Sequence, residues 1–206
     1  MIMKYLNLRL YLVTDENCLP PGRDLFDAVE EALQAGVTLV QYREKNGPGK
    51  SMLEKSRKLI ALCHKYNVPL LVNDRLDIAL LSGADGVHLG QEDIPVAEAR
   101  RLAGENFLIG ATAHNVEEAL AAEAAGADYL GCGAVFATHT KKDTVPLGLD
   151  GLQAIRQAVR IPIAGIAGIT TENHQQVLGT GADGVAVVSG ILGADSISDT
   201  VIRFLR

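Results

Sequence analysis

The chain alternates between stretches with helical spacing and short apolar runs, and one kind of junction between them recurs. Residues 83–89 read GADGVHL, residues 126–130 read GADYL and residues 181–188 read GADGVAVV, with a weaker copy, AGVTLV, at residues 35–40. Each copy follows a helical pattern, so its glycine is expected to end the helix in a left-handed conformation. The apolar run that follows is typical of a strand buried on both faces of a parallel sheet.

Four further apolar runs lie between these copies, at residues 10–13, 69–72, 107–110 and 161–165. The segments between the runs mostly have helical spacing, as in Ala28, Val29, Ala32 and Leu33. Eight strand–helix units of about 26 residues each predict an α/β fold, a (β/α)8 TIM barrel that forms a single domain over residues 1–206. A doubly wound open sheet uses the same alternation, but the eight strands and the lack of GxGxxG after the first favour the barrel.

Composition narrows the range of partners. The 206 residues are 48% apolar, and 19 basic against 25 acidic side chains give a net charge of −6, which argues against binding to nucleic acid. The apolar amino-terminal segment is interrupted by Asn7 and Arg9 and is too short to span a bilayer, so we expect no membrane association. Three scattered cysteines without CxxC spacing indicate free thiols and a cytoplasmic location. Exposed apolar faces of the barrel could support a homo-oligomer.

In a barrel of this kind, chemistry belongs at the carboxyl ends of the strands. After the second run, strand alternation sends Gln41, Arg43 and Lys45 to the same side, into the barrel mouth. An amide and two cations converging there suit a polar anionic ligand, because arginine offers a fork of donors and lysine a point charge. The alternative is an exposed loop in which Arg43 pairs with Glu44.

Two acids follow the next two strands, Asp74 after the third and Asp93 after the fourth. Neighbouring strands lie about 5 Å apart, so the two carboxylates can converge on one point. Two carboxylates without histidine or cysteine suit a hard cation, usually Mg²⁺ shared with a phosphate. The alternative is that each acid caps the helix that follows it, near Leu76 and after Pro95.

The remaining strand ends are also polar or rich in small residues. Thr112 follows the fifth strand and could bind a ligand or cap the helix that starts at Asn115. The long segment 136–148 is dense in hydroxyls and cations, which favours an anion-binding loop over a solvated connector. Small residues at 164–169 and 187–190 would let backbone N–H groups approach a phosphate, although tight helix–strand packing also uses glycine.

Taken in order, these segments resemble the thiamine-phosphate synthase family. The matching pieces run from the second strand to the last: QYREK at 41–45, NDR at 73–75, GVHLGQED at 86–93, GADYLGCGAVFATHTKKD at 126–143, AGIAGI at 164–169 and VVSGI at 187–191. Each piece is weak alone, but the series, one per strand end, is specific. The resemblance implies a (β/α)8 barrel that joins 4-amino-5-hydroxymethyl-2-methylpyrimidine diphosphate to 4-methyl-5-(2-phosphoethyl)thiazole, both small-molecule substrates, and releases diphosphate.

The resemblance also assigns roles, each carried over to the matching position of this sequence. It implies catalysis by Arg43, Lys45, Thr112 and Lys141, with Mg²⁺ as cofactor on Asp74 and Asp93. The pyrimidine diphosphate would contact Gln41, Tyr42, Arg43, Glu44, Lys45, Asn73, Thr112 and Lys141. The thiazole phosphate would contact Thr138, His139, Thr140, Gly168, Val188 and Ser189. The reaction would be dissociative, with the leaving diphosphate stabilised by the metal and the cations and no enzyme nucleophile required.

The sequence departs from the family pattern at a few positions, and other functions stay open. Thr112 stands where the family commonly has serine, Ala134 and Ala137 where it has prolines, and Ala167 where it has a glycine, which places a methyl group near the proposed thiazole phosphate. The alternatives are a thiazole tautomerase of the same superfamily, a regulator that only binds thiamine precursors, and another phosphosugar enzyme. The presence of both acids and the absence of the histidine that the tautomerase has favour the synthase. The complete set of cations at the strand ends argues against a regulator without catalysis. A phosphosugar enzyme would need an acid–base pair in the mouth, and none is convincing.

Overall fold

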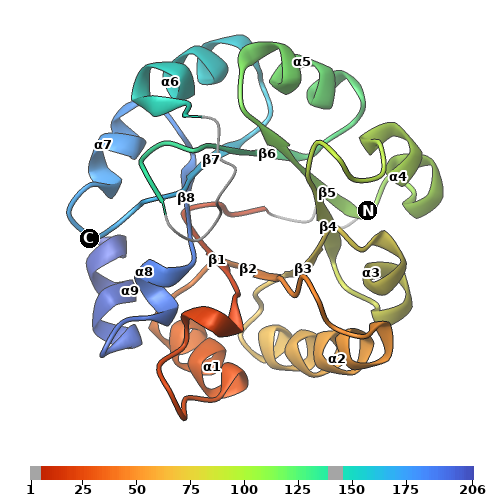
Figure 1. Cartoon of the computed structure of the whole chain (residues 1–206). Helices are drawn as coiled ribbons and strands as arrows, with labels where there is room; N and C mark the ends of the chain where they lie inside the picture. Colours follow the sequence, from red (N-terminus) through yellow and green to blue (C-terminus); the bar gives the residue numbers. More distant parts are fainter. Residues whose placement is uncertain (1–5, 139–145) are drawn as a thin grey trace.

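The computed structural model describes residues 6–138 and 146–206, which fold into a closed barrel of parallel strands (Figure 1). Each strand pairs with the next in sequence, and β8 pairs with β1 through Leu10↔Val185 and Leu12↔Val187, so the open-sheet alternative is wrong. The strands are β1 (Leu10–Val13), β2 (Leu39–Tyr42), β3 (Leu70–Asn73), β4 (Gly86–Leu89), β5 (Leu108–Ala113), β6 (Tyr129–Cys132), β7 (Ile163–Ile166) and β8 (Gly184–Val187).

Helices cover the outside of the barrel, as Figure 1 shows in a view down its axis. A single 3-10 turn, η1 (Glu16–Cys18), follows β1. The helices are α1 (Leu25–Ala35), α2 (Gly49–Lys65), α3 (Leu76–Ser82), α4 (Val96–Ala103), α5 (Val116–Ala124), α6 (Gly148–Ala158), α7 (His174–Gly179), α8 (Ser189–Leu192) and α9 (Ile197–Leu205). None of the helices in the described ranges is long and apolar enough to cross a bilayer.

The recurring glycines end helices as the sequence predicts. Gly36 caps α1 with φ 116° and Gly83 caps α3 with φ 78°, both in the left-handed region that favours glycine. Gly126 and Gly181 also have positive φ, at 94° and 90°. At its other end α1 is capped by Asp24, whose carboxylate accepts from the N–H groups of the first turn.

The core has two layers, because successive side chains of a strand point to opposite faces. Tyr11, Leu39, Leu71 and Tyr129 fill the inside of the barrel with other members of the inner cluster. The intervening strand residues pack against the helices in a larger outer cluster. Because both faces of each strand are covered, the strands read as continuous apolar runs.

Three strand ends lie further along the chain than the apolar runs predict. β2 ends at Tyr42 rather than near residue 40, β3 includes Asn73, and β5 continues to Ala113. The reason for the last is that the pairing with β6 extends through Thr112↔Gly131. Polar side chains that the sequence predicts to lie in loops therefore belong to hydrogen-bonded strands of the barrel.

Candidate active site

A cavity of about 760 Å³ opens at the carboxyl ends of the strands. Its wall includes eleven of the residues predicted from the sequence, contributed by β2, β3, β5 and the loops that follow most of the strands. They are Gln41, Arg43, Lys45, Asn73, Asp74, Asp93, Thr112, Thr138, Gly168, Val188 and Ser189. The predicted pyrimidine diphosphate, metal and thiazole phosphate positions thus share one cavity.

Tyr42 and Glu44, expected to contact the pyrimidine diphosphate, do not line this cavity. Tyr42 alternates with Gln41 and Arg43 along the chain, so its side chain is buried in the outer cluster between barrel and helices. Glu44 lies beside α2, with its carboxylate 3.9 Å from Lys55 Nζ. Strand alternation, which sends every second residue away from the mouth, explains both corrections.

The predicted residues His139, Thr140 and Lys141 lie outside the residues that the structure describes. Thr138, which precedes them, lies on the cavity wall. Their assigned roles toward the two substrates therefore stay predictions.

The cations of β2 and its loop are held by acids from neighbouring elements. Arg43 Nη1 donates to Asp15 Oδ2 at 2.6 Å, and the backbone N–H of Arg43 donates to Thr14 Oγ1 at 3.0 Å. The expected alternative, a pair between Arg43 and Glu44, is wrong, because the partner follows β1 on the adjacent strand. Lys45 reaches across to β3, where its Nζ lies 2.5 Å from Asp74 Oδ2.

The two acids form a contact pair at the cavity wall. Their carboxyl groups are within hydrogen-bonding contact, and Gly90 N–H donates to Asp93 Oδ2 at 2.6 Å. Burial and the neighbouring carboxylate raise the pKa of Asp93. Burial alone would raise the pKa of Asp74, but hydrogen bonds from Lys45 and Asp93 lower it below its usual value.

Neither acid is a helix cap, so that alternative is wrong. α3 has Arg75 at its N-cap and α4 has Pro95, and neither helix end has a side-chain capping bond. The carboxylates point into the cavity instead. In the part of the chain described, no cluster of three or more His, Cys, Asp or Glu side chains could hold a metal ion by itself. A cation between Asp74 and Asp93 would take its remaining oxygens from water or from a ligand.

Asn73 adds a buried donor that no described residue pairs with. Its side chain is 8% exposed, and Nδ2 has no hydrogen-bond partner among the described residues. Buried amide groups are normally paired, and an unmade bond costs about 1–3 kcal/mol. Because Asn73 lines the cavity beside Asp74, this amide fits a ligand that supplies an acceptor.

Thr112 faces the cavity from within β5 and does not cap α5, whose cap is Asn115. Its Oγ1 lies 3.1 Å from His88 Nε2. Its carbonyl oxygen accepts from Gln91 Nε2 at 2.5 Å. The hydroxyl is thus positioned by a neighbouring strand and by the loop after β4.

The loops after β7 and β8 form the opposite part of the wall. A side chain at Gly168 would lie 2.4 Å from the carbonyl oxygen of Ala137, so glycine lets the loop after β6 approach closely. Val188 and Ser189 lead into α8, a short extra helix before α9. Barrels of this class commonly bind phosphate with the loops after strands 7 and 8 and a short extra helix.

The fold agrees with comparisons to known proteins. The model of the thiamine monophosphate synthase family matches residues 10–191. Thiamine-phosphate synthases from Clostridium acetobutylicum and Chloroflexus aurantiacus are 49% and 53% identical, over 96% and 92% of this chain and 93% and 88% of theirs. The solved thiamine phosphate pyrophosphorylase of Pyrococcus furiosus superimposes with a TM-score of 0.88 at 41% identity, covering 96% of this chain and 94% of that one.

The chain belongs to the thiamine monophosphate synthase family. Because the relatives match over nearly the whole of both chains, it is an enzyme of thiamine biosynthesis, a transferase with thiamine-phosphate synthase activity.

Ala167 stands in this family site with φ 82°, in the left-handed region. A side chain in this region costs the folded state about 1–2 kcal/mol, which a glycine at this position would remove. Glycine also has more conformational freedom in the unfolded chain, and this offsets about half of that gain in stability. We therefore expect Ala167→Gly to raise the free energy of unfolding by about 0.5–1 kcal/mol in urea. Ala137→Gly, in the loop after β6 and without positive φ, is the control and should destabilise slightly. Equal destabilisation by both substitutions would show that Ala167 is not strained.

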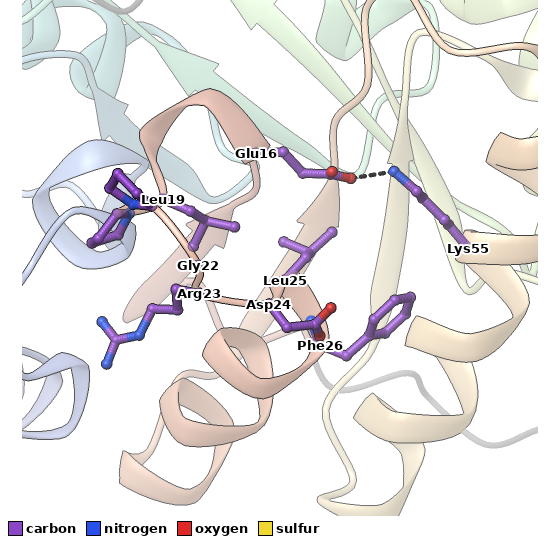
Figure 2. Close-up of a pocket in the computed structure, with 10 residues that line it drawn as sticks. Glu16, Leu19, Gly22, Arg23, Asp24, Leu25, Phe26 and Lys55 are labelled. Atoms are coloured by element: carbon purple, nitrogen blue, oxygen red, sulfur yellow. Dashed lines mark hydrogen bonds and ion pairs between the residues drawn. The ribbon is translucent and has the colours of Figure 1, made fainter.

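A second, smaller hollow of about 350 Å³ lies at the loop between β1 and α1 (Figure 2). Its charged groups already have partners: Lys55 pairs with Glu16, and Arg23 lies 3.2 Å from Glu31. Asp24 accepts from the first N–H groups of α1. The named charged groups of this hollow are therefore all engaged in contacts within the protein.

Sequence reasoning did not identify Asp15, Tyr11, Tyr129 or His88, although all lie at or beneath the mouth. Asp15 comes two residues after β1, so the rule that polar residues follow strands would have found it. The two tyrosines and the histidine lie inside strands, and alternation alone gives no sign of their mutual hydrogen bonds.

Proposed function

We propose that the chain joins 4-amino-5-hydroxymethyl-2-methylpyrimidine diphosphate to 4-methyl-5-(2-phosphoethyl)thiazole, forming thiamine phosphate and diphosphate. The observation that carries the proposal is the contact pair of Asp74 and Asp93, with Lys45 and Arg43 on the same rim of one cavity. Two adjacent carboxylates that could share a cation, beside an arginine and a lysine that could bind phosphate, suit a leaving diphosphate. The family membership supports the same activity.

The residues present fit a bound Mg²⁺. Mg²⁺ is usually held by one or two carboxylates together with the phosphates of a substrate, and the cavity offers two acids without nitrogen or sulfur ligands at the same point. Asp74 and Asp93 would hold the ion. When bound, Mg²⁺ neutralises charge on the diphosphate.

The chain's own residues then act on the substrates by position and charge. Arg43 and Lys45 contact the diphosphate, which leaves with the electron pair of the broken C–O bond. The remaining CH₂ cation is stabilised by electron donation from the pyrimidine amino group. The thiazole nitrogen forms the new C–N bond with its lone pair, so no enzyme nucleophile is needed.

The thiazole phosphate is assigned to the wall formed by Gly168, Val188 and Ser189. The backbone N–H groups of these loops lie where barrels of this class bind phosphate. This places the two substrates on opposite sides of the cavity, with the reacting carbon between them.

The coupling assay tests the proposal directly. Purified protein with both substrates and Mg²⁺ is expected to release thiamine phosphate and diphosphate in equal amounts, measured by ³¹P NMR. Tautomerisation of the thiazole carboxylate without coupling would show the tautomerase alternative instead. Binding of both compounds without any product would show a regulator.

We also propose a cytoplasmic location. The support is that Cys18, Cys63 and Cys132 are free thiols, as expected in a reducing compartment. Burial raises the pKa of Cys63 and of Cys132 to about 12, so both thiols are protonated and unreactive.

A further inference from the structure

Asn173 holds the loop after β7 by two hydrogen bonds of its side-chain amide. Its Nδ2 donates to the carbonyl oxygen of Gly168 at 2.9 Å, and its Oδ1 accepts from the backbone N–H of Thr170 at 2.8 Å. Asn173 directly precedes α7, a place where an asparagine side chain commonly caps the helix, but it makes no capping bond with α7. The amide is turned back toward the loop instead.

The loop lies between Asn173 and the cavity. Gly168, Ile169 and Thr170 line the cavity wall, whereas Asn173 does not. Asn173 therefore contacts the loop from behind, on the side away from the cavity. A residue in this place acts on a ligand only through the backbone that it holds.

The bond from Asn173 fixes the direction of one peptide group. In a planar trans peptide the carbonyl and the following N–H point in opposite directions, so the N–H of Ile169 points away from Asn173. The preceding peptide is held in the same way, because Phe136 N–H donates to the carbonyl oxygen of Ala167 at 3.2 Å. The N–H of Gly168 is thereby turned away from the loop after β6. Neither N–H has a hydrogen-bond partner among the described residues.

The backbone of this loop needs such support. Ala167 has φ 82° and Gly168 has φ 64°, so two successive residues lie in the left-handed region. This conformation is unfavourable for alanine, and glycine has no preference for it over others. If the two carbonyls lost their donors, the peptide groups could rotate and their N–H groups would no longer share a direction.

We propose that Asn173 is a positioning residue for phosphate binding, which keeps the N–H of Ile169 ready beside that of Gly168 for the phosphate of the thiazole substrate. The inference rests on the proposed function, which assigns this phosphate to the wall formed by Gly168, Val188 and Ser189. N–H groups that are already held in place bind an anion more strongly than mobile ones, because no loop has to become ordered on binding. Asn173 thus acts on the phosphate and not on the thiazole ring.

This role can be measured as a preference between two ligands. The alcohol 4-methyl-5-(2-hydroxyethyl)thiazole has the same ring as the thiazole phosphate but lacks the anion. The ratio of the dissociation constant of the alcohol to that of the phosphate ester therefore reports what the phosphate contributes to binding. Calorimetry measures both constants without the pyrimidine substrate, so no product needs to form.

Asn173→Ala is expected to lower this ratio by at least about tenfold, because a hydrogen bond to a charged group is among the stronger ones in proteins. The affinity for inorganic diphosphate with Mg²⁺ should be unchanged, because the diphosphate is assigned to the opposite side of the cavity. Asn115→Ala is the matched control. Asn115 also precedes a helix, α5, but its side chain caps that helix and lies outside the cavity wall, so the ratio should be unchanged.

Asn173→Ser separates positioning from folding. Serine is favoured before a helix, but its single short hydroxyl cannot replace both bonds of the amide, so this variant is also expected to lower the ratio. The wild type offers a test that needs no variant. In ¹H–¹⁵N spectra the amide proton of Ile169 is expected to shift downfield when the thiazole phosphate binds, and not when the alcohol binds.

Each outcome bears on the proposal. Folded Asn173 variants with the wild-type ratio would refute the positioning role. An Ile169 amide that does not respond to the thiazole phosphate would also refute it, and this result is available even if neither variant folds. Equal losses of diphosphate and thiazole phosphate binding would overturn the assignment of the loop to the thiazole phosphate. Failure of the proposed coupling appears separately, in the coupling assay on the wild type.

Discussion

Asp93→Asn is expected to lower kcat/KM for the coupling reaction by about a hundredfold in a protein that folds normally. Asparagine keeps an oxygen that can accept from Gly90 N–H, so the loop after β4 keeps its shape. It removes one of the two charges that meet at the cavity wall, and with it about 3 kcal/mol of stabilisation of the leaving diphosphate. Initial rates at several Mg²⁺ concentrations measure the loss.

The control for this variant is Asp77→Asn. Asp77 lies on the first turn of α3 and is exposed, with its carboxylate 2.6 Å from Arg75. Asp77 is not part of the cavity wall, and a surface ion pair contributes little. The kcat/KM of Asp77→Asn should therefore stay within about twofold of the wild-type value. Wild-type turnover in Asp93→Asn, with an unchanged requirement for Mg²⁺, would refute the metal assignment.

Gly110→Ala is expected to lower the free energy of unfolding by about 3 kcal/mol. A methyl group at Gly110 would lie 2.2–2.3 Å from the ring and hydroxyl atoms of Tyr129. The ring has nowhere to move, because it is fully buried and packs edge-on against Tyr11. Urea unfolding followed by circular dichroism measures the change.

Gly179→Ala is the matched substitution. Gly179 is the last residue of α7, and a methyl group there would meet no atom within 4 Å. Alanine also favours helix over glycine, so stability should be unchanged or slightly higher. If the Gly110→Ala protein were no less stable than the Gly179→Ala protein, the result would contradict the tight packing described for the barrel interior.

Much of the fold could be predicted from the sequence because the same physical constraint recurs. Buried parallel strands produce continuous apolar runs, and helix ends with positive φ favour glycine, as at Gly36 and Gly83. The ends of the strands were predicted less well. β5 extends past Gly110 to Ala113 because of its pairing with β6, which no local pattern reveals.

The candidate site was predictable where alternation and strand order decide the direction of a side chain. Gln41, Arg43 and Lys45 line the cavity as expected, and the same rule excludes Tyr42 and Glu44, which the family resemblance had included. The contact between Asp74 and Asp93 followed from their places after adjacent strands.

Partners from distant strands could not be predicted in this way. Arg43 binds Asp15 rather than its neighbour in sequence, because β1 lies beside β2. The link from Tyr129 to His88 joins residues 41 positions apart. Such pairs depend on the closed barrel and on which side chains are long enough to meet inside it.

Calorimetric titration with inorganic diphosphate, with and without Mg²⁺, is the most direct test of the central claim. This claim is that the two acids, through Mg²⁺, and the cations of the barrel mouth bind diphosphate jointly. The account predicts that Mg²⁺ lowers the dissociation constant of diphosphate at least about tenfold, equivalent to about 1.4 kcal/mol. The same dissociation constant in the presence of Mg²⁺ and of a chelator would contradict it.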